Sequence, residues 1–291
     1  MDDKSDFELP PYENNEAEKN STNNNDKNSN NEKFTIYLPP KVDDTFQKTS
    51  NNVFFPPNLV DILSQPTLLI ERQVQIYKVT LGVQQANKYH IMNPQGHVIG
   101  YMYETTSFGK ALSRQALGTT RPFKFMITNL NGELLLEVKR SFTILISTIT
   151  VRLPYRNQQN QLIHQEIGKS EQIFHPIKRK YRLSIKNQTQ NQFDEFGHIN
   201  ARILAVTFPI KNKQELVIGG VDRSWTGIMR EFVANSPVYV VRFDVNAPQN
   251  NIEKYYTPRG PPLDLNQRAV LLGCAISIDF DYFDPRRRRN N

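Results

Sequence analysis

The stretch AVLLGCAISI, residues 269–278, is an unbroken run of apolar and small side chains. If it forms a helix that begins near Leu265, apolar residues cover every face, and such a helix is buried on all sides. The run is about half the roughly 20 residues that a bilayer-spanning helix requires. Asp279 and Asp281 follow directly and are predicted to end it. The run therefore favours a helix buried within the fold over one that crosses a membrane.

Short β-strand patterns recur through most of the chain. Residues 88–96 (KYHIMNPQG), 123–132 (FKFMITNLNG) and 180–188 (KYRLSIKNQ) alternate aromatic or β-branched residues and then reach a turn. Asn131-Gly132 is the strongest hairpin signal among these turns. About a dozen short strands at regular spacing predict a barrel or a sandwich.

A few segments depart from this pattern. A short helix is expected at residues 59–63, after Asn58. The polar stretches 156–169 and 246–262 are expected to be surface loops. Asp279 and Asp281, with Asp284, also suggest a cation site, but we favour the interpretation that they end a helix or alternate on a strand.

The N-terminal segment has a different composition. Residues 2–33 are rich in Asn, Glu, Asp and Lys and nearly free of aliphatic side chains, so we expect disorder. The predicted division is a disordered acidic tail at 1–52, a folded domain at 53–285 and a basic tail at 286–291.

The charge is unevenly distributed. Residues 2–33 hold nine acidic residues and four Lys, net −5, whereas the whole chain carries +7, so the remainder carries +12. A basic domain favours an anionic partner such as phospholipid headgroups or nucleic acid, although a basic domain with no such partner is an open alternative. The run Arg286, Arg287, Arg288 and Arg289 is a candidate contact for anionic lipid, and equally a nuclear address or a solvated tail.

Conventional catalysis is not visible in the residues. Cys274 is the only cysteine, which excludes an internal disulfide and a zinc site built on several cysteines. The histidines have no metal-ligand spacing, and we find neither a Gly-rich phosphate loop nor a nucleophile elbow. The acidic N-terminus is neither a signal peptide nor a transit peptide, and Asp2 excludes N-myristoylation.

The segment VDRSWTGIMREF, residues 221–232, holds the only tryptophan and looks like an active-site loop. No recognised nucleophile, base or metal motif lies in or around it, so structural roles are expected. Trp225 would be a packing anchor, and Arg230 and Glu231 a paired or solvated edge beyond Gly227.

Five blocks in order carry a family resemblance. They are LVDILSQPTLLIERQ (59–73), NKYHIMNPQG (87–96), RPFKFMITNLNGELLLEVKR (121–140), VDRSWTGIMREF (221–232) and LNQRAVLLGCAISIDFDYFD (265–284). Together they resemble the phospholipid scramblase family, whose fold is similar to tubby-like domains. The resemblance implies a closed antiparallel barrel of about twelve strands around a central C-terminal apolar helix. It also implies ATP-independent movement of phospholipids between membrane leaflets, with calcium as activator.

The chain departs from the family pattern in its calcium segment. In the family, several acids follow the tryptophan block, whereas residues 234–246 (ANSPVYVVRFDVN) contain one. The remaining ligand candidates are Asn235, Asp244 and Asn246. Since calcium takes about six to eight oxygen ligands, we expect its affinity to be poor or absent.

Membrane attachment is also reduced. The family's cysteine cluster, the expected palmitoylation site, has no counterpart at residues 141–151. Contact is therefore expected to rely on the basic surface, the arginine tail or the C-terminal helix. The tetrapeptide Leu9-Pro10-Pro11-Tyr12 is a weak signal for a WW-domain partner.

Two functions follow. One is lipid scrambling, by an oligomer whose C-terminal helix is released into the membrane. The alternative is a non-catalytic adaptor that binds anionic lipid at a membrane surface. We expect the protein at the cytosolic face of a membrane, above all the plasma membrane, with an intracellular membrane or the nucleus as alternatives. A DNA-binding role in the nucleus is a third and weaker hypothesis.

Overall fold

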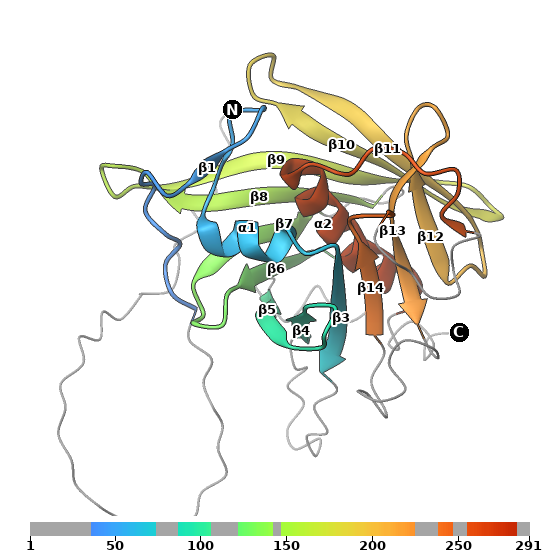
Figure 1. Ribbon diagram of the computed structural model, residues 1–291, viewed down its shortest axis with the longest axis horizontal. Helices are drawn as coiled ribbons and strands as arrows, with labels where there is room; N and C mark the ends of the chain where they lie inside the picture. Colours follow the sequence, from blue (N-terminus) through green and yellow to red (C-terminus); the bar gives the residue numbers. More distant parts are fainter. Residues whose placement is uncertain are drawn as a thin grey trace, which may run out of the picture. The chain divides into compact units, whose positions relative to one another are not determined.

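Twelve antiparallel strands form a closed barrel around one helix in the computed structural model (Figure 1). The structure describes residues 36–73, 87–105, 122–141, 147–224, 238–246 and 255–283, all within one unit, residues 35–291. The barrel strands are β3 (Thr67–Gln73), β4 (Lys88–Met92), β5 (Val98–Thr105), β6 (Phe123–Thr128), β7 (Leu134–Arg140), β8 (Thr148–Arg156), β9 (Leu162–Ile173), β10 (Lys178–Asn187), β11 (Gln192–Arg202), β12 (Thr207–Lys211), β13 (Val217–Ser224) and β14 (Val238–Arg242).

The barrel is a simple meander. Each strand pairs with the next one in the chain, and β14 closes the barrel by pairing with β3, where Tyr239 lies opposite Ile70. Closure leaves no edge strand in the barrel. The predicted fold class, a closed antiparallel barrel of about twelve strands, is confirmed.

The predicted hairpin signals mark real turns. Asn131-Gly132 joins β6 to β7, and Gly132 has φ 82°, a left-handed conformation that glycine adopts without steric cost. Gly96, also at φ 82°, ends the turn between β4 and β5.

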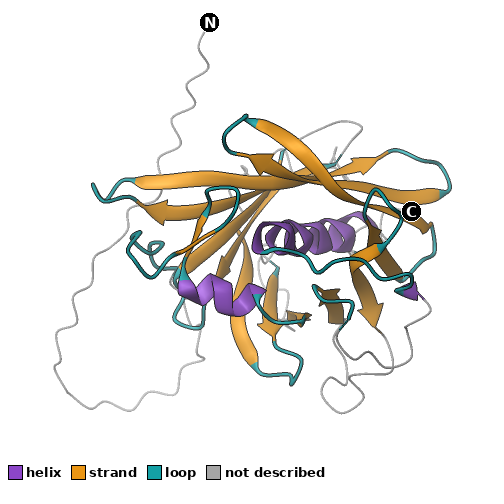
Figure 2. Ribbon diagram, turned by 45° about the horizontal axis from the view of Figure 1, so that its top comes forward, coloured by secondary structure: helices purple, strands orange, loops and turns teal. Residues whose placement is uncertain are grey.

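Helix α2 (Leu265–Tyr282) occupies the inside of the barrel, and Figure 2 shows it enclosed by strands. Its start is fixed by a capping box: the Asp264 carboxylate accepts from the Gln267 N–H at 2.9 Å, and the Gln267 side chain accepts from the Asp264 N–H at 3.0 Å. Residues 269–281 are all buried. The prediction of a helix buried on every side is confirmed.

Two acids do not end this helix, contrary to the sequence prediction. Asp279 and Asp281 lie inside its last turn, which continues to Tyr282. Both carboxylates are buried and bound by side chains of the barrel wall. Partners from distant strands therefore let the helix continue past them.

The N-terminal boundary also differs from the prediction. Residues 36–52, assigned from the sequence to the tail, lie on the barrel: the Tyr37 N–H donates to the Gly132 carbonyl and the Val42 N–H to the Arg156 carbonyl, each at 2.9 Å. Strand β1 (Gln47–Lys48) pairs with β2 (Phe54–Phe55). These are backbone hydrogen bonds, which no side-chain pattern in residues 36–52 reveals.

Two further segments complete the described fold. Helix α1 (Pro57–Leu63) confirms the short helix expected there and buries Leu59, Ile62 and Leu63. The expected loop at 156–169 is wrong beyond the turn at 157–161, because residues 162–169 belong to β9. This strand is mostly polar because much of it faces solvent, whereas Ile167 points into the core.

Candidate functional site

The last turn of α2 carries two buried carboxylates bound to the barrel wall. Asp279 accepts hydrogen bonds from the hydroxyls of Tyr89, at 2.6 Å, and Tyr239. The guanidinium of Arg72 lies 3.8 Å from the same carboxylate. A charge in this position requires such partners, since burial without them is costly.

Asp281 has a second set of partners. Arg140 Nη1 lies 2.5 Å from Oδ1, and the Tyr181 hydroxyl donates to Oδ2 at 2.7 Å. The Ser277 hydroxyl, one turn earlier, donates at 3.2 Å. Arg140 lies over the ring of Phe123, 4.6 Å from its centroid, so the cation contacts both a carboxylate and an aromatic face.

The pKa shifts in this cluster indicate that its side chains hold the end of α2 in place. Burial raises the pKa of Asp281, although Arg140 opposes the shift. Burial also raises the pKa of the Tyr89, Tyr181 and Tyr239 hydroxyls, so these remain neutral donors at neutral pH. The tyrosines therefore act as hydrogen-bond donors to the helix carboxylates and not as general bases.

The described residues do not form a conventional active site. No group of three His, Cys, Asp or Glu side chains among them is placed to hold a metal ion. Burial raises the pKa of the Cys274 thiol to about 12, and the side chain is fully buried, so it is not a thiolate nucleophile at neutral pH.

The barrel end at which α2 finishes is called here the C-terminal mouth. In the up-and-down meander, β9–β10 and β11–β12 turn at this mouth, and β13 ends there at Ser224. The Arg179 guanidinium stacks over Tyr282 at 3.9 Å from the ring centroid, and Arg223 lies over Phe283 at 4.2 Å. Two arginines from the wall thus hold the aromatic residues at the end of the helix.

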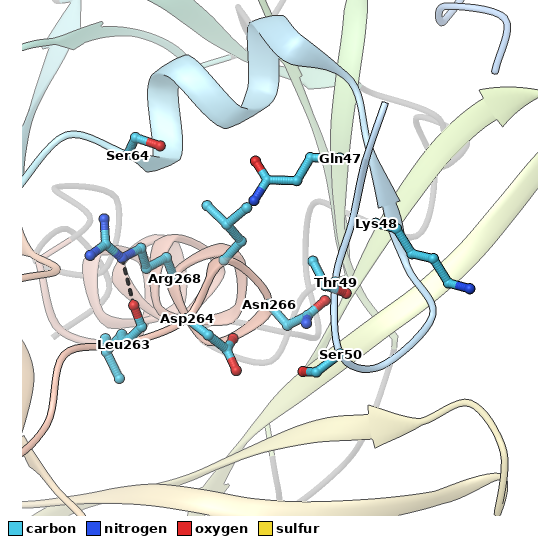
Figure 3. A pocket seen from close by; sticks show the side chains of 10 residues that line it. Gln47, Lys48, Thr49, Ser50, Ser64, Leu263, Asp264, Asn266 and Arg268 are labelled. Atoms are coloured by element: carbon cyan, nitrogen blue, oxygen red, sulfur yellow. Dashed lines mark hydrogen bonds between the residues drawn. The ribbon is translucent and has the colours of Figure 1, made fainter. Parts of the chain in front are cut away.

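The opposite end, the N-terminal mouth, holds an open pocket between the β1–β2 turn, the end of α1 and the start of α2 (Figure 3). Its volume is about 560 Å³. Arg268 is fixed there by donating to the carbonyls of Leu263 and Leu63, each at 2.8 Å. Asn266 is 1% exposed, and neither amide atom has a hydrogen-bond partner among the described residues. The pocket therefore has room and hydrogen-bonding atoms for small polar molecules, including water.

Most of the site residues predicted from the sequence fall outside the described residues. These are Trp225, Gly227, Arg230, Glu231, Asn235, Arg286, Arg287, Arg288 and Arg289, together with the Leu9–Tyr12 tetrapeptide. Asp244 and Asn246 are described. They contact each other, since the Asn246 N–H donates to Asp244 Oδ1 at 2.8 Å in the turn after β14.

No helix in the described residues has the length and apolar character needed to cross a membrane. Helix α2 is the longest of them at 18 residues, but it includes Arg268, Asp279 and Asp281.

Comparison with known proteins gives the family. The Scramblase family model matches residues 47–285, which is most of the chain, so this chain belongs to the scramblase family. The match begins before residue 53, in agreement with the earlier start of the folded domain. No solved structure matches the chain.

Three relatives show the range of similarity. "Altered inheritance rate of mitochondria protein 25" of Saccharomyces cerevisiae is 35% identical over 273 residues, covering 89% of this chain and 83% of the relative. A phospholipid scramblase family protein of Schizosaccharomyces pombe is 34% identical over 236 residues, covering 76% and 60%. Human phospholipid scramblase 2 is 24% identical over 243 residues, covering 80% and 72%.

Sequence reasoning missed the partners of the helix carboxylates. Arg140 ends a strand and Tyr181 sits in an alternating one, and neither position looks unusual in isolation. The available signal was the pair of acids directly after the apolar run at 269–278. If that helix fills a barrel, buried carboxylates so close to it need donors from the wall.

Proposed function

We propose that this protein works at a phospholipid membrane and moves phospholipids between the two leaflets without ATP. Membership of the scramblase family is the observation that carries the proposal. The absence of a metal cluster or reactive thiol among the described residues is compatible with it, because moving a lipid breaks no covalent bond.

A second candidate function is lipid binding without movement. The observation that favours it is the position of α2. This helix is enclosed by the barrel and bound at its C-terminal turn by Arg140, Tyr181, Tyr89 and Tyr239. A lipid headgroup needs a polar path through the hydrocarbon, and a buried helix does not offer one. Translocation then requires α2 to leave the barrel or several copies to assemble.

A vesicle assay separates the two candidates. The full chain is reconstituted into vesicles that carry a trace phospholipid with a fluorescent headgroup, and a membrane-impermeant reductant is added outside. Scrambling predicts that fluorescence falls well below the level left by bleaching the outer leaflet alone. If the protein cofloats with the vesicles and only the outer leaflet bleaches, the protein binds lipid without moving it.

The basic tail is proposed as one membrane contact. Arg286, Arg287, Arg288 and Arg289 contribute four positive charges, each worth roughly 1 kcal/mol near an anionic surface. Replacing all four with Ser should weaken binding to anionic vesicles at low salt, and the difference should shrink as salt screens the charges. Unchanged binding would exclude this role.

A separate question within this proposal is which cellular membrane the protein acts on. The plasma membrane is expected from the resemblance, whereas the name of the Saccharomyces cerevisiae relative refers to mitochondrial inheritance. A fluorescent tag on the full chain in yeast cells, imaged with plasma-membrane and mitochondrial markers, decides between them.

A further inference from the structure

We propose that two neighbouring loops at the C-terminal mouth insert their tips into the surface of an anionic phospholipid bilayer. The loops are the β9–β10 turn, residues 174–177, and the β11–β12 connection, residues 203–206. This docking surface, called here the tip surface, rests on the proposed action at a membrane and specifies which face of the barrel meets it.

Large apolar side chains at the tips are unusually exposed. Phe174 and Ile177 in the first loop are 78% and 67% exposed, and Leu204 in the second is 87% exposed. Ile203 and Val206 are about half exposed, at 49% and 47%. Half of the large hydrophobic residues that are exposed in the described parts of the chain therefore gather in two short loops. Such clustering marks a binding surface, whereas single exposed residues do not.

The two loops are held side by side. Their strands pair directly, with Lys178 opposite Arg202 at the start of the β10–β11 ladder. Arg179 Nη1 also donates to the carbonyl of Ala205 at 3.3 Å, which joins the base of one loop to the other. Both turns lie at the same end of the barrel (Figure 1). The apolar tips thus project together from a rigid base.

The two loops and the strand residues next to them carry charge of one sign. Residues 172–180 and 199–208 contain no acid, and they contribute Lys178, Arg179, Lys180 and Arg202. Of these, Lys178 and Arg202, at the feet of the two loops, are exposed. Apolar groups at the tip with cations just behind them match a bilayer, in which acyl chains lie beneath anionic headgroups.

The described part of the chain ends at the same mouth. Phe283 follows the end of α2, and its ring packs against Phe208 of β12, with centroids 6.3 Å apart. The sequence that follows Phe283 carries the four arginines of residues 286–289, so the chain adds positive charge after this end of the helix.

A bilayer fits this surface better than a second copy of the chain does. Two copies meeting through the tip surface would bring like charges together, which is destabilising. An anionic bilayer instead neutralises them.

The experiment places an environment-sensitive dye on the tip. Leu204→Cys is labelled with the fluorophore NBD in the full chain, and Leu130→Cys is the matched control. Leu130 is also exposed, at 54%, but it lies in the β6–β7 turn at the N-terminal mouth. The native Cys274 is fully buried and should not take up the label. The probe membranes are phosphatidylcholine vesicles with and without phosphatidylserine.

With phosphatidylserine present, the dye at 204 should shift to the blue, brighten severalfold and be quenched by brominated acyl chains. The dye at 130 should stay unchanged. Leu204→Asn and Ile177→Asn should lower vesicle partitioning at least about tenfold, and Leu130→Asn should not. Lys178→Gln and Arg202→Gln should each lower it about fivefold at low salt. Circular dichroism checks that each variant is folded.

The outcomes separate this proposal from the proposed function. If the chain binds vesicles and the dye at 204 stays in water, docking uses another surface and the tip proposal is wrong, while action at a membrane stands. If both dyes report insertion equally, the docking is not specific to the tips and the proposal also fails. If the chain binds no vesicles, both proposals fail together. A dye that shifts at high protein concentration without lipid would instead show a protein partner, namely a second copy.

Discussion

Arg140 Nη1 lies 2.5 Å from Asp281 Oδ1 and thereby joins the end of β7 to the last turn of α2 across 141 residues of sequence. Both side chains are almost fully buried, at 1% and 4% exposure. This ion pair is one of the buried links between the enclosed helix and the barrel wall, together with the tyrosine hydrogen bonds to Asp279 and Asp281. Anything that releases the helix from the barrel has to break it.

Arg140→Met should destabilise the protein by about 3–5 kcal/mol, because it leaves Asp281 buried without its cation. The free energy of unfolding, measured by urea titration, gives the value. The double variant Arg140→Met with Asp281→Asn should recover much of the loss, since the amide can still accept from Tyr181. A double variant as unstable as the single one would contradict the ion-pair explanation.

A surface pair provides the control. Arg182 Nε lies 3.1 Å from Glu195, with the arginine side chain 50% exposed. Arg182→Met should change stability by less than about 1 kcal/mol, because exposed ion pairs contribute little.

The sequence predicts the barrel well because local patterns encode it. Alternating strands and the Asn131-Gly132 turn specify neighbouring pairs, and a meander is built almost entirely from neighbours. The all-round apolar run at 269–278 then identifies the helix that fills it. The one strand pairing in this barrel that joins segments far apart in the sequence is that of β14 with β3.

The candidate sites were harder to predict because their contacts are long-range or lack a side-chain pattern. Asp281 was expected to end a helix, since its partner Arg140 is invisible without the three-dimensional fold. Residues 36–52 were assigned to the tail because their attachment is through backbone hydrogen bonds. The exposure of Leu204 likewise depends on where the chain turns, which its hydrophobicity does not reveal.

Gly273 of α2 should not tolerate a methyl group. A Cβ there would lie 2.7 Å from a methyl of Val151 and 2.9 Å from one of Ile149. Helix propensity alone favours alanine by about 1 kcal/mol, but overpacking a tight core costs about 1–3 kcal/mol. Gly273→Ala should therefore be destabilising in thermal unfolding. Adding Val151→Ala should recover part of the loss. If Gly273→Ala alone stabilised the protein, the barrel would have room for an extra methyl group at this position.

Cys274 should be unreactive in the folded protein. Its thiol is fully buried between α2 and the barrel wall, and burial raises its pKa to about 12. Ellman's reagent at neutral pH should give almost no signal in native buffer and one thiol per chain in urea. Rapid labelling of the native protein would mean that α2 leaves the barrel readily. Adding anionic vesicles tests whether a membrane releases the helix, since release would then appear as thiol reactivity.

Glu137 should make stability sensitive to acid. Burial alone would raise its pKa, but hydrogen bonds from His164 and Lys124 outweigh burial and hold the pKa below the ordinary 4.5. Because the folded-state pKa is lowered, the stabilising contribution is present above the unfolded-state pKa. It is lost as the pH falls below about 4.5, through the folded-state value.

Urea unfolding of the wild type between neutral pH and about pH 3.5 should show this loss as a lower free energy of unfolding. Glu137→Gln should be less stable at neutral pH and should fall less steeply with acid. Glu195→Gln, which removes a carboxylate from the exposed pair with Arg182, is the control and should keep most of the wild-type slope. If the free energy of unfolding fell equally steeply with acid in the wild type and in Glu137→Gln, Glu137 would not be the cause of the acid sensitivity.

Calcium should bind weakly or not at all. Asp244 is the one acid in residues 234–246, and one of its carboxylate oxygens already accepts from the Asn246 N–H. A single carboxylate with amide oxygens falls short of the roughly six to eight oxygen ligands that calcium usually takes. Isothermal titration of the full chain should therefore show no micromolar binding, and Asp244→Asn should leave the titration unchanged. Micromolar affinity that disappears in Asp244→Asn would place a calcium site in this segment after all and would make calcium a regulator of the proposed lipid movement.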